Sequence, residues 1–158
     1  MYTADHGLSV GSHGLLGKQN MYEPSVRIPL IIGGGCMPSG SSDAMTCHTD
    51  LFPTISALAG LSLPESVDGV DQSAAVRGER EDSPRQLRAY YKDFQTMVSD
   101  GKMKLIRYQK SPRDGCGSEA VQLFDLSKDP SELNDLSDDP KYADIRQELV
   151  GMADFARY

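Results

Sequence analysis

The dipeptide Asp100–Gly101 constrains the fold of this 158-residue chain more than any other feature. It lies between two runs of strand-forming residues, 95–99 and 102–108. An Asp-Gly pair favours the backbone angles of a two-residue hairpin turn, so we expect the two runs to pair antiparallel. Residues 120–126 are expected to form the next strand, and Asp139–Pro140 to begin a terminal helix. The apolar face of that helix would comprise Tyr142, Ile145, Leu149 and Met152.

The first part of the chain follows a different pattern. Residues 1–4 predict a sheet-centre strand, and residues 28–32 form a β-branched run, apolar on both faces, that fits a buried parallel strand. Between them, the glycine-rich residues 7–20 predict a loop. Thr49 is expected to cap a helix that ends at Gly60. The apolar face of this helix would comprise Leu51, Ile55 and Leu58.

The order of these elements predicts the fold class and the domains. A strand followed by a helix is typical of an α/β layer, whereas the second half predicts an antiparallel sheet with one covering helix. Residues 64–87 are rich in charge, proline and serine and read as a surface connection. We therefore expect an α/β domain in residues 1–86 and a smaller antiparallel-sheet subdomain with a terminal helix in residues 87–158.

Composition excludes several classes of function. With 23 acidic and 16 basic side chains, the net charge of -7 and the pI near 4.9 disfavour binding to nucleic acid or anionic lipid. No stretch reaches the ~20 apolar residues that a membrane span needs. Cys36, Cys47 and Cys116 are odd in number and widely spaced, which favours neither a disulfide framework nor a zinc site. Free, mostly buried thiols are expected.

Asp5–His6–Gly7 is the strongest candidate for chemistry, because it follows a predicted strand at the position where open α/β sheets hold ligands. The carboxylate suits a hard cation such as calcium or magnesium, and the imidazole suits transition metals, so the pair alone leaves the metal open. A polar turn without a metal is the alternative reading of so short a motif.

The surrounding sequence is more specific. The stretch T-A-D-H-G-L-S-V-G-S-H-G-L-L-G-K, followed by Y-E-P-S-V-R-I-P-L-I-I, closely resembles the C-terminal half of the sulfatase catalytic domain. The segments 48–54 and 58–60 are similar to the family's next helix, and 67–71 to the loop beyond it. L-F-D-L with D-P-S-E and N-D-L is similar to its C-terminal strand and turn. The resemblance covers nearly the whole chain and implies the alkaline-phosphatase-like architecture.

The resemblance implies roles for Asp5, His6 and Lys18, and leaves that of His13 open. Asp5 and His6 would be two ligands of a divalent metal, with calcium expected and manganese or magnesium as alternatives. Lys18 would contact the sulfate oxygens, so that metal and ammonium together neutralise charge on the ester. His13 lies in the same loop and would either meet the substrate or leaving group or fix the turn. The implied reaction is hydrolysis of a sulfate ester on a small molecule or glycan.

The resemblance also implies what this chain lacks. The family makes its nucleophile, a formylglycine, from Cys or Ser in Cys/Ser-x-Pro/Ala-x-Arg upstream of this region, and we expect it to be absent here. Cys36-Met37-Pro38-Ser39 has Gly40 at the arginine position. Gly7-Leu8-Ser9-Val10-Gly11 fits a nucleophile elbow, but the glycines that follow oppose the helix an elbow requires. The family's pair of metal-binding aspartates is expected upstream as well.

Two alternatives to a sulfatase portion follow. One is a phosphonate or phosphodiester hydrolase of the same superfamily, and the other is a non-catalytic remnant or assembly domain. If the strands expected before residue 1 are absent, exposed edges and an apolar face predict a homo-oligomer. A signal peptide upstream would make the protein periplasmic or secreted; the first residues carry no such signal.

Overall fold

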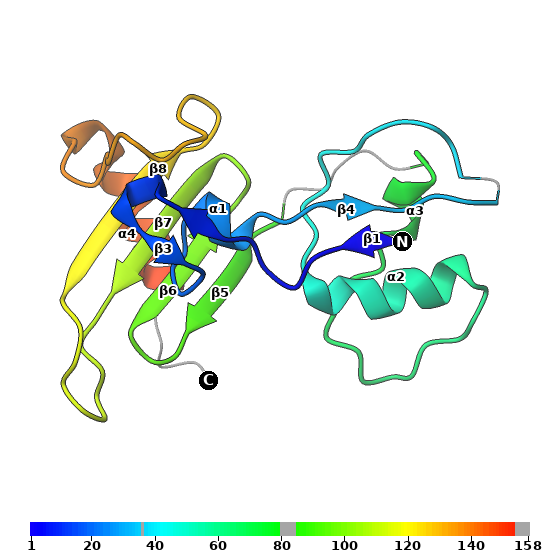
Figure 1. Cartoon of the computed structure of the whole chain (residues 1–158), viewed down its shortest axis with the longest axis horizontal. Coiled ribbons are helices and arrows are strands. Elements are labelled where there is room, and N and C mark those ends of the chain that lie inside the picture. The colour runs from blue at the N-terminus through cyan, green and yellow to red at the C-terminus, as the bar shows by residue number, and fades with distance from the viewer. Residues whose placement is uncertain (36, 80–84, 154–158) are drawn as a thin grey trace. The chain divides into compact units, whose positions relative to one another are not determined.

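The computed structural model describes residues 1–35, 37–79 and 85–153. The chain forms two compact units (Figure 1), the first made of residues 1–5 and 29–85 and the second of residues 6–28 and 86–158. The expected domains, 1–86 and 87–158, stay a prediction. The compact units differ from them in residues 6–28, because this segment packs on the sheet of the second unit.

The second unit is built on a four-stranded antiparallel sheet in the order β5-β6-β7-β8. The strands are β5 (Leu87–Tyr91), β6 (Gln95–Ser99), β7 (Met103–Tyr108) and β8 (Ala120–Asp125). The predicted hairpin is confirmed: the Asp100 carboxylate accepts hydrogen bonds from the backbone N–H groups of Lys102 (2.9 Å) and Met103 (2.7 Å). Gly101 has a φ of 89°, a conformation that glycine adopts without a steric penalty.

Helix α4 (Ala143–Met152) covers one face of this sheet and follows a 3-10 turn, η3 (Pro140–Tyr142). Leu149 and the following Ala153 are buried against alternate strand residues of the sheet. These are Val98, Met103, Leu105 and Leu123. Ile145 does not join this cluster, and it is 38% exposed where Leu149 is 3% exposed. The buried face of α4 is therefore narrower than the spacing of its apolar residues predicted.

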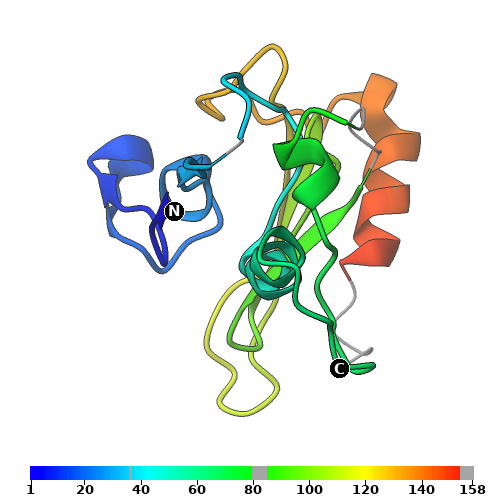
Figure 2. The ribbon, with the colours of Figure 1, turned by 90° about the vertical axis from the view of Figure 1, so that its right-hand side faces the viewer.

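Residues 6–28 cover the other face of the same sheet, as Figure 2 shows from the side. They form a small hairpin, β2 (Ser9–Val10) and β3 (Leu16–Gly17), a 3-10 turn, η1 (Ser12–Gly14), and a one-turn helix, α1 (Glu23–Val26). Their buried contact with the sheet comprises Met21, Tyr22, Met97, Ile106 and Phe124. The predicted loop thus lies on a rigid antiparallel sheet.

In the first unit, β1 (Tyr2–Thr3) pairs with β4 (Leu30–Ile31) as a two-stranded sheet. The expectation of a buried parallel strand in residues 28–32 is wrong, because β1 and β4 run antiparallel and Ile31 is 60% exposed. Both strands of a two-stranded ribbon are edges. An apolar run therefore does not by itself decide which strand it pairs with or whether it is buried.

Helix α2 (Leu51–Leu58) begins after a 3-10 turn, η2 (His48–Asp50), and the first unit also contains the short helix α3 (Ser73–Val76). Thr49 does not cap the helix as expected. Instead the buried Asp50 carboxylate accepts a hydrogen bond from the backbone N–H of Cys47 (2.9 Å). Gly60, with a φ of 69°, follows the helix as predicted.

The buried face of α2 is the polar one. Thr54 and Ser56 are buried with Pro53, whereas Phe52 and Ile55 are exposed. Thr54 Oγ1 accepts a hydrogen bond from the backbone N–H of Gln72 (3.0 Å), so the Thr54 hydroxyl is satisfied inside the unit. The first unit is therefore held largely by polar contacts.

The described residues contain no helix long and apolar enough to cross a membrane. Cys47 is half-buried and Cys116 exposed, and both are free thiols. The expectation of mostly buried thiols is therefore wrong for Cys116, and Cys36 lies outside the described residues.

Candidate active site

The loop that carries the sequence motif wraps around the backbone of α1. The Gly7 N–H donates to Ser25 O (2.8 Å), Ser9 Oγ lies 3.2 Å from Ser25 Oγ, and Asn20 Nδ2 donates to Ser9 Oγ (3.2 Å). A Cβ atom on Gly7 would lie 2.1 Å from Pro24 O, which no side chain tolerates. Glycine is therefore required at position 7 by close approach of two backbones.

His6 and Lys18 meet at the outer end of this loop. His6 Nδ1 lies 2.8 Å from Gly7 O, and His6 Nε2 lies 2.5 Å from Lys18 Nζ. A carbonyl oxygen only accepts, so the hydrogen-bond network assigns the proton of a neutral imidazole to Nδ1. The Nε2 lone pair then accepts from the Lys18 ammonium. The structure thus brings together two of the four predicted site residues.

Asp5 is the last residue of the first unit's N-terminal segment, and His6 is the first residue of the second unit. The Asp5 side chain is exposed, and that of His6 is half-buried. Within the described residues, no group of three or more His, Cys, Asp or Glu side chains is arranged to hold a metal ion. The metal role of Asp5 and His6 stays a prediction.

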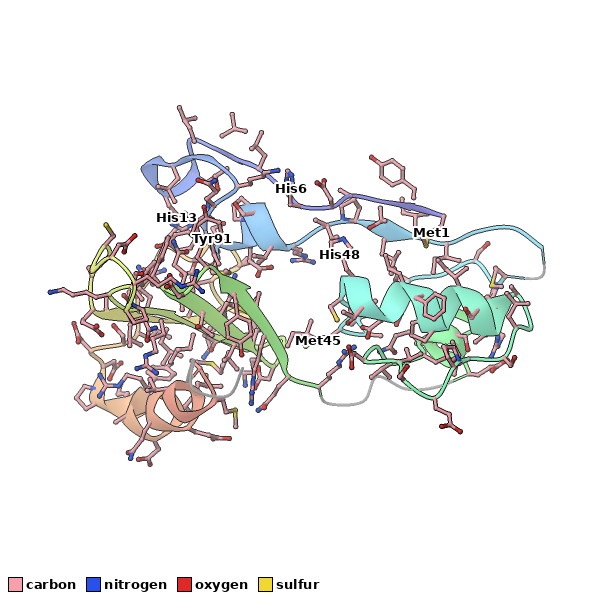
Figure 3. The ribbon with its side chains drawn as sticks, turned by 90° about the horizontal axis from the view of Figure 1, so that it is seen from below. Met1, His6, His13, Met45, His48 and Tyr91 are labelled. Carbon is pink, nitrogen blue, oxygen red and sulfur yellow. The ribbon has the colours of Figure 1, made fainter. Side chains whose placement is uncertain are left out.

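His13 makes a different set of contacts. Its ring stacks on Tyr22 with centroids 3.8 Å apart and planes 8° from parallel, and its Nε2 lies 4.0 Å from Glu132 Oε2. Figure 3 shows His13 among the side chains that cover the sheet, with His6 apart from them. These contacts agree with a residue that fixes the turn, one of the two roles expected of His13; a substrate contact stays a prediction.

Tyr22 fixes the start of α1 to the sheet. Its hydroxyl donates to Gln122 Oε1 (2.7 Å), the same oxygen to which the Tyr108 hydroxyl donates (3.2 Å). The Tyr22 ring also meets Phe124 edge-on, with centroids 6.2 Å apart. Burial, and then the neighbouring Tyr22, raise the pKa of Tyr108 well above its ordinary value. The raised pKa keeps the Tyr108 hydroxyl protonated at neutral pH, as its hydrogen bond to Gln122 Oε1 requires.

Lys104 was missed by sequence reasoning. Its side chain is fully buried, and Nζ lies 2.8 Å from Glu23 Oε1 and 2.8 Å from Glu132 Oε1. The sequence of β7 does contain a sign of this buried charge. Lys104 lies two residues before Ile106, on the same face of a buried strand, where an apolar residue is expected. A charge in that position requires partners from other elements.

The expectation that the Cys/Ser-x-Pro/Ala-x-Arg pattern is absent is wrong as a statement about sequence, because Ser73-Ala74-Ala75-Val76-Arg77 fits Ser-x-Ala-x-Arg. Ser73 is buried at the start of α3, and its hydroxyl donates to Asp71 Oδ2 (3.1 Å) while accepting from Arg77 Nη2 (3.2 Å). The Ser73 N–H donates to Asp71 Oδ1 (2.7 Å). Both ends of the motif thus have a structural use, and we assign Ser73 no catalytic role.

Comparison with known proteins decides the family. The family model described as N-sulphoglucosamine sulphohydrolase, C-terminal, matches residues 11–154. The chain belongs to this sulfatase family. Choline-sulfatase of Rhizobium meliloti strain 1021 is 33% identical to this sulfatase chain over 144 residues, which are 89% of the chain and 27% of the relative. The sulfatase resemblance predicted from the sequence is confirmed.

Solved structures confirm the predicted α/β sulfatase fold. One, of a protein in complex with its substrate D-glucosamine-2-N,6-O-disulfate, has a TM-score of 0.78 at 25% identity and covers 96% of this sulfatase chain and 32% of its own. The phosphonate monoester hydrolase of Agrobacterium radiobacter has a TM-score of 0.69 at 23% identity, covering 95% and 33%; this second likeness concerns the fold alone. The chain spans about a third or less of the relatives it matches.

Proposed function

We propose that this chain supplies the metal- and sulfate-binding loop of a sulfatase that hydrolyses a sulfate ester. The observation that carries the proposal is the contact between His6 Nε2 and Lys18 Nζ on a loop that is fixed to the sheet of the second unit. Membership of the sulfatase family supports it.

Asp5 and His6 offer two donor types that divalent metals accept. Asp5 provides a carboxylate, and the hydrogen bond from His6 Nδ1 to Gly7 O leaves the Nε2 lone pair as the second donor. A divalent metal there would withdraw charge from the sulfate oxygens. Calcium takes ~6–8 oxygen ligands, so further ligands would have to come from outside this pair. We keep calcium as the expected metal and manganese or magnesium as alternatives.

Lys18 would change partner when the site is occupied. Its ammonium lies against the same Nε2 lone pair that a metal would use. A cation there would repel the ammonium, which would then turn to an anion. We therefore propose that Lys18 contacts a sulfate oxygen and neutralises charge on it. Formylglycine, the nucleophile that the family uses, would come from outside residues 1–158.

The substrate class is proposed as a sulfate ester on a small molecule or sugar. Choline-sulfatase is the 33% identical relative, and the protein solved with D-glucosamine-2-N,6-O-disulfate is 25% identical. Both names refer to a sulfate group, attached to choline in one case and to glucosamine in the other. A phosphonate or phosphodiester substrate is the alternative within the superfamily.

The test is a titration of the 158-residue chain with Mn²⁺, followed by NMR of its three imidazole side chains. Millimolar Mn²⁺ should broaden the signals of His6 before those of His13 and His48, and an excess of Ca²⁺ should reverse the effect. Asp5→Ala should abolish it, whereas Asp138→Ala should not. Broadening of His6 that is absent at 10 mM Mn²⁺, or unchanged in Asp5→Ala, would contradict the metal site.

A second arm tests whether this chain by itself contains a complete catalytic site. The isolated chain should not hydrolyse an aryl sulfate, because its nucleophile would lie elsewhere. Turnover that disappears in Lys18→Met would show instead that this chain contains the whole site.

A further inference from the structure

Lys104 forms a buried charge cluster that the proposed chemistry does not use. Its Nζ contacts Glu23 Oε1 and Glu132 Oε1, both at 2.8 Å, and the side chains of Lys104 and Glu132 are fully buried. Replacement of a buried ion pair by apolar residues of similar volume is often neutral or stabilising. Stability alone is therefore a poor explanation for this cluster, and the segments that it joins indicate a different role.

The cluster joins the sheet to the loop that carries Lys18. Lys104 lies on β7, Glu132 in the turn after β8, and Glu23 at the first residue of α1. The second carboxylate oxygen of Glu132 accepts from the Glu23 N–H (2.7 Å) and lies 4.0 Å from His13 Nε2. One carboxylate thus faces the sheet, the start of α1 and the turn η1.

The backbone supports the same interpretation. Both His13 (φ 55°) and Glu132 (φ 56°) adopt the left-handed conformation, which among non-glycine residues of the described ranges is otherwise seen only at Lys92. Such residues persist where the surrounding structure over-determines them. Here the two residues face each other across the cluster. The two left-handed residues therefore lie on either side of the same ion-pair contact.

We infer that Lys104 is a positioning residue: by holding the Glu132 carboxylate against His13, it fixes the conformation of residues 7–20 and so the approach of Lys18 to His6. The importance of this positioning for catalysis rests on the proposed function. The positioning itself does not, because the loop, the cluster and the sheet all belong to the second unit.

The test is amide hydrogen exchange on the full chain without metal or sulfate, so its outcome is independent of whether the loop binds either. Gly11 N–H donates to Leu15 O (2.9 Å), and Leu15 N–H donates to Ser12 O (3.0 Å). In Lys104→Met, exchange at these two amides should rise at least tenfold relative to the amides of β6 and β7. An equal rise in loop and sheet would show a merely structural role and overturn the inference.

The matched control is Lys128→Met. Lys128 also pairs with a carboxylate at 2.7 Å, that of Asp125, but its side chain is 72% exposed, whereas that of Lys104 is fully buried. The loop-to-sheet exchange ratio should stay within twofold of the unmodified chain. A rise as large as in Lys104→Met would overturn the inference.

A second variant keeps the inference testable if Lys104→Met does not fold. Glu132→Gln retains an acceptor for the Glu23 N–H but removes the charge that faces His13 and Lys104. It should raise the ratio of amide exchange rates in the loop to those in the sheet several-fold. It should also shift the imidazole nitrogen signals of His13, while those of His48 stay unchanged. An unchanged ratio with unshifted His13 signals would overturn the inference.

Discussion

At the scale of single residues, Asp50 has the clearest link between environment and stability. Its carboxylate is fully buried, forms an ion pair with Arg85 and accepts hydrogen bonds from the N–H groups of Cys47 (2.9 Å) and Val70 (2.8 Å). Burial alone would raise the pKa of Asp50, but the hydrogen bonds from Arg85 and from the backbone outweigh it and lower the pKa below its ordinary value.

This lowered pKa predicts acid sensitivity of the first unit. A carboxyl whose pKa is depressed in the folded state stabilises that state fully above the unfolded pKa, and the contribution is lost as pH falls through the folded pKa. The protection of the α2 amides against hydrogen exchange should therefore stay constant between pH 7 and pH 5. It should decrease when the pH is lowered below about 4. Asp50→Asn should reduce the free energy of unfolding by about 3 kcal/mol at neutral pH. In this variant, the exchange protection of the α2 amides should no longer fall in acid. Protection unchanged down to pH 3 in the unmodified chain would contradict this account.

Single residues also show which parts of the candidate site could be predicted from the sequence alone. Asp5, His6, His13 and Lys18 could be proposed as site residues because they lie in one contiguous, recognisable stretch. Lys104 was not, since its meaning depends on Glu23, which lies 81 residues away in the sequence, and on Glu132. A buried charge is identified by its partners, and pattern reasoning along the chain does not bring those partners together.

At the scale of elements, α4 offers a direct comparison of predicted and actual burial. Leu149 packs against Val98, Leu105 and Leu123, whereas Ile145 on the same helix is largely outside that cluster. Leu149→Ala should reduce the free energy of unfolding by about 2–5 kcal/mol, and Ile145→Ala by less than about 1 kcal/mol. Urea unfolding followed by circular dichroism measures both. Equal losses in the two variants would mean that the helix packs differently from what the structure shows.

The elements that the sequence predicted correctly are those fixed by local chemistry. The Asp100–Gly101 turn contains its own hydrogen bonds, so the hairpin could be read without knowledge of the rest of the chain. The segment 28–32 and the exposed face of α2 could not, because burial of an apolar run depends on which other surface covers it. Periodicity predicts an apolar face but not its partner.

At the scale of the whole molecule, the two units differ in how they are held together. In the described ranges, every buried apolar residue apart from Pro53 and Ala75 belongs to the second unit. In the first unit, Tyr2 and Ile31 are cross-strand partners and both are more than half exposed. Phe52 on α2 is also more than half exposed. Apolar surface of this kind favours association.

We therefore predict that the isolated chain forms a dimer or larger species. Light scattering at tens of micromolar should give at least twice the mass of one chain, and Ile31→Lys should shift the population toward the single-chain mass. Leu133→Lys, at an exposed apolar residue of the second unit, is the matched control and should leave the mass unchanged. A single-chain mass for the unmodified protein, or equal effects of both variants, would count against association through the first unit.

The second unit is built from two separate stretches, residues 6–28 and 86–158, and this has a consequence during synthesis. The loop with His6 and Lys18 is synthesised before its sheet, because Lys104 follows its partner Glu23 by 81 residues. At a synthesis rate of about 5–20 residues per second, roughly 4–16 seconds pass between the synthesis of Glu23 and that of Lys104. Throughout that interval Met21 and Tyr22 lack Met97, Ile106 and Phe124, the sheet residues against which they are buried in the folded unit.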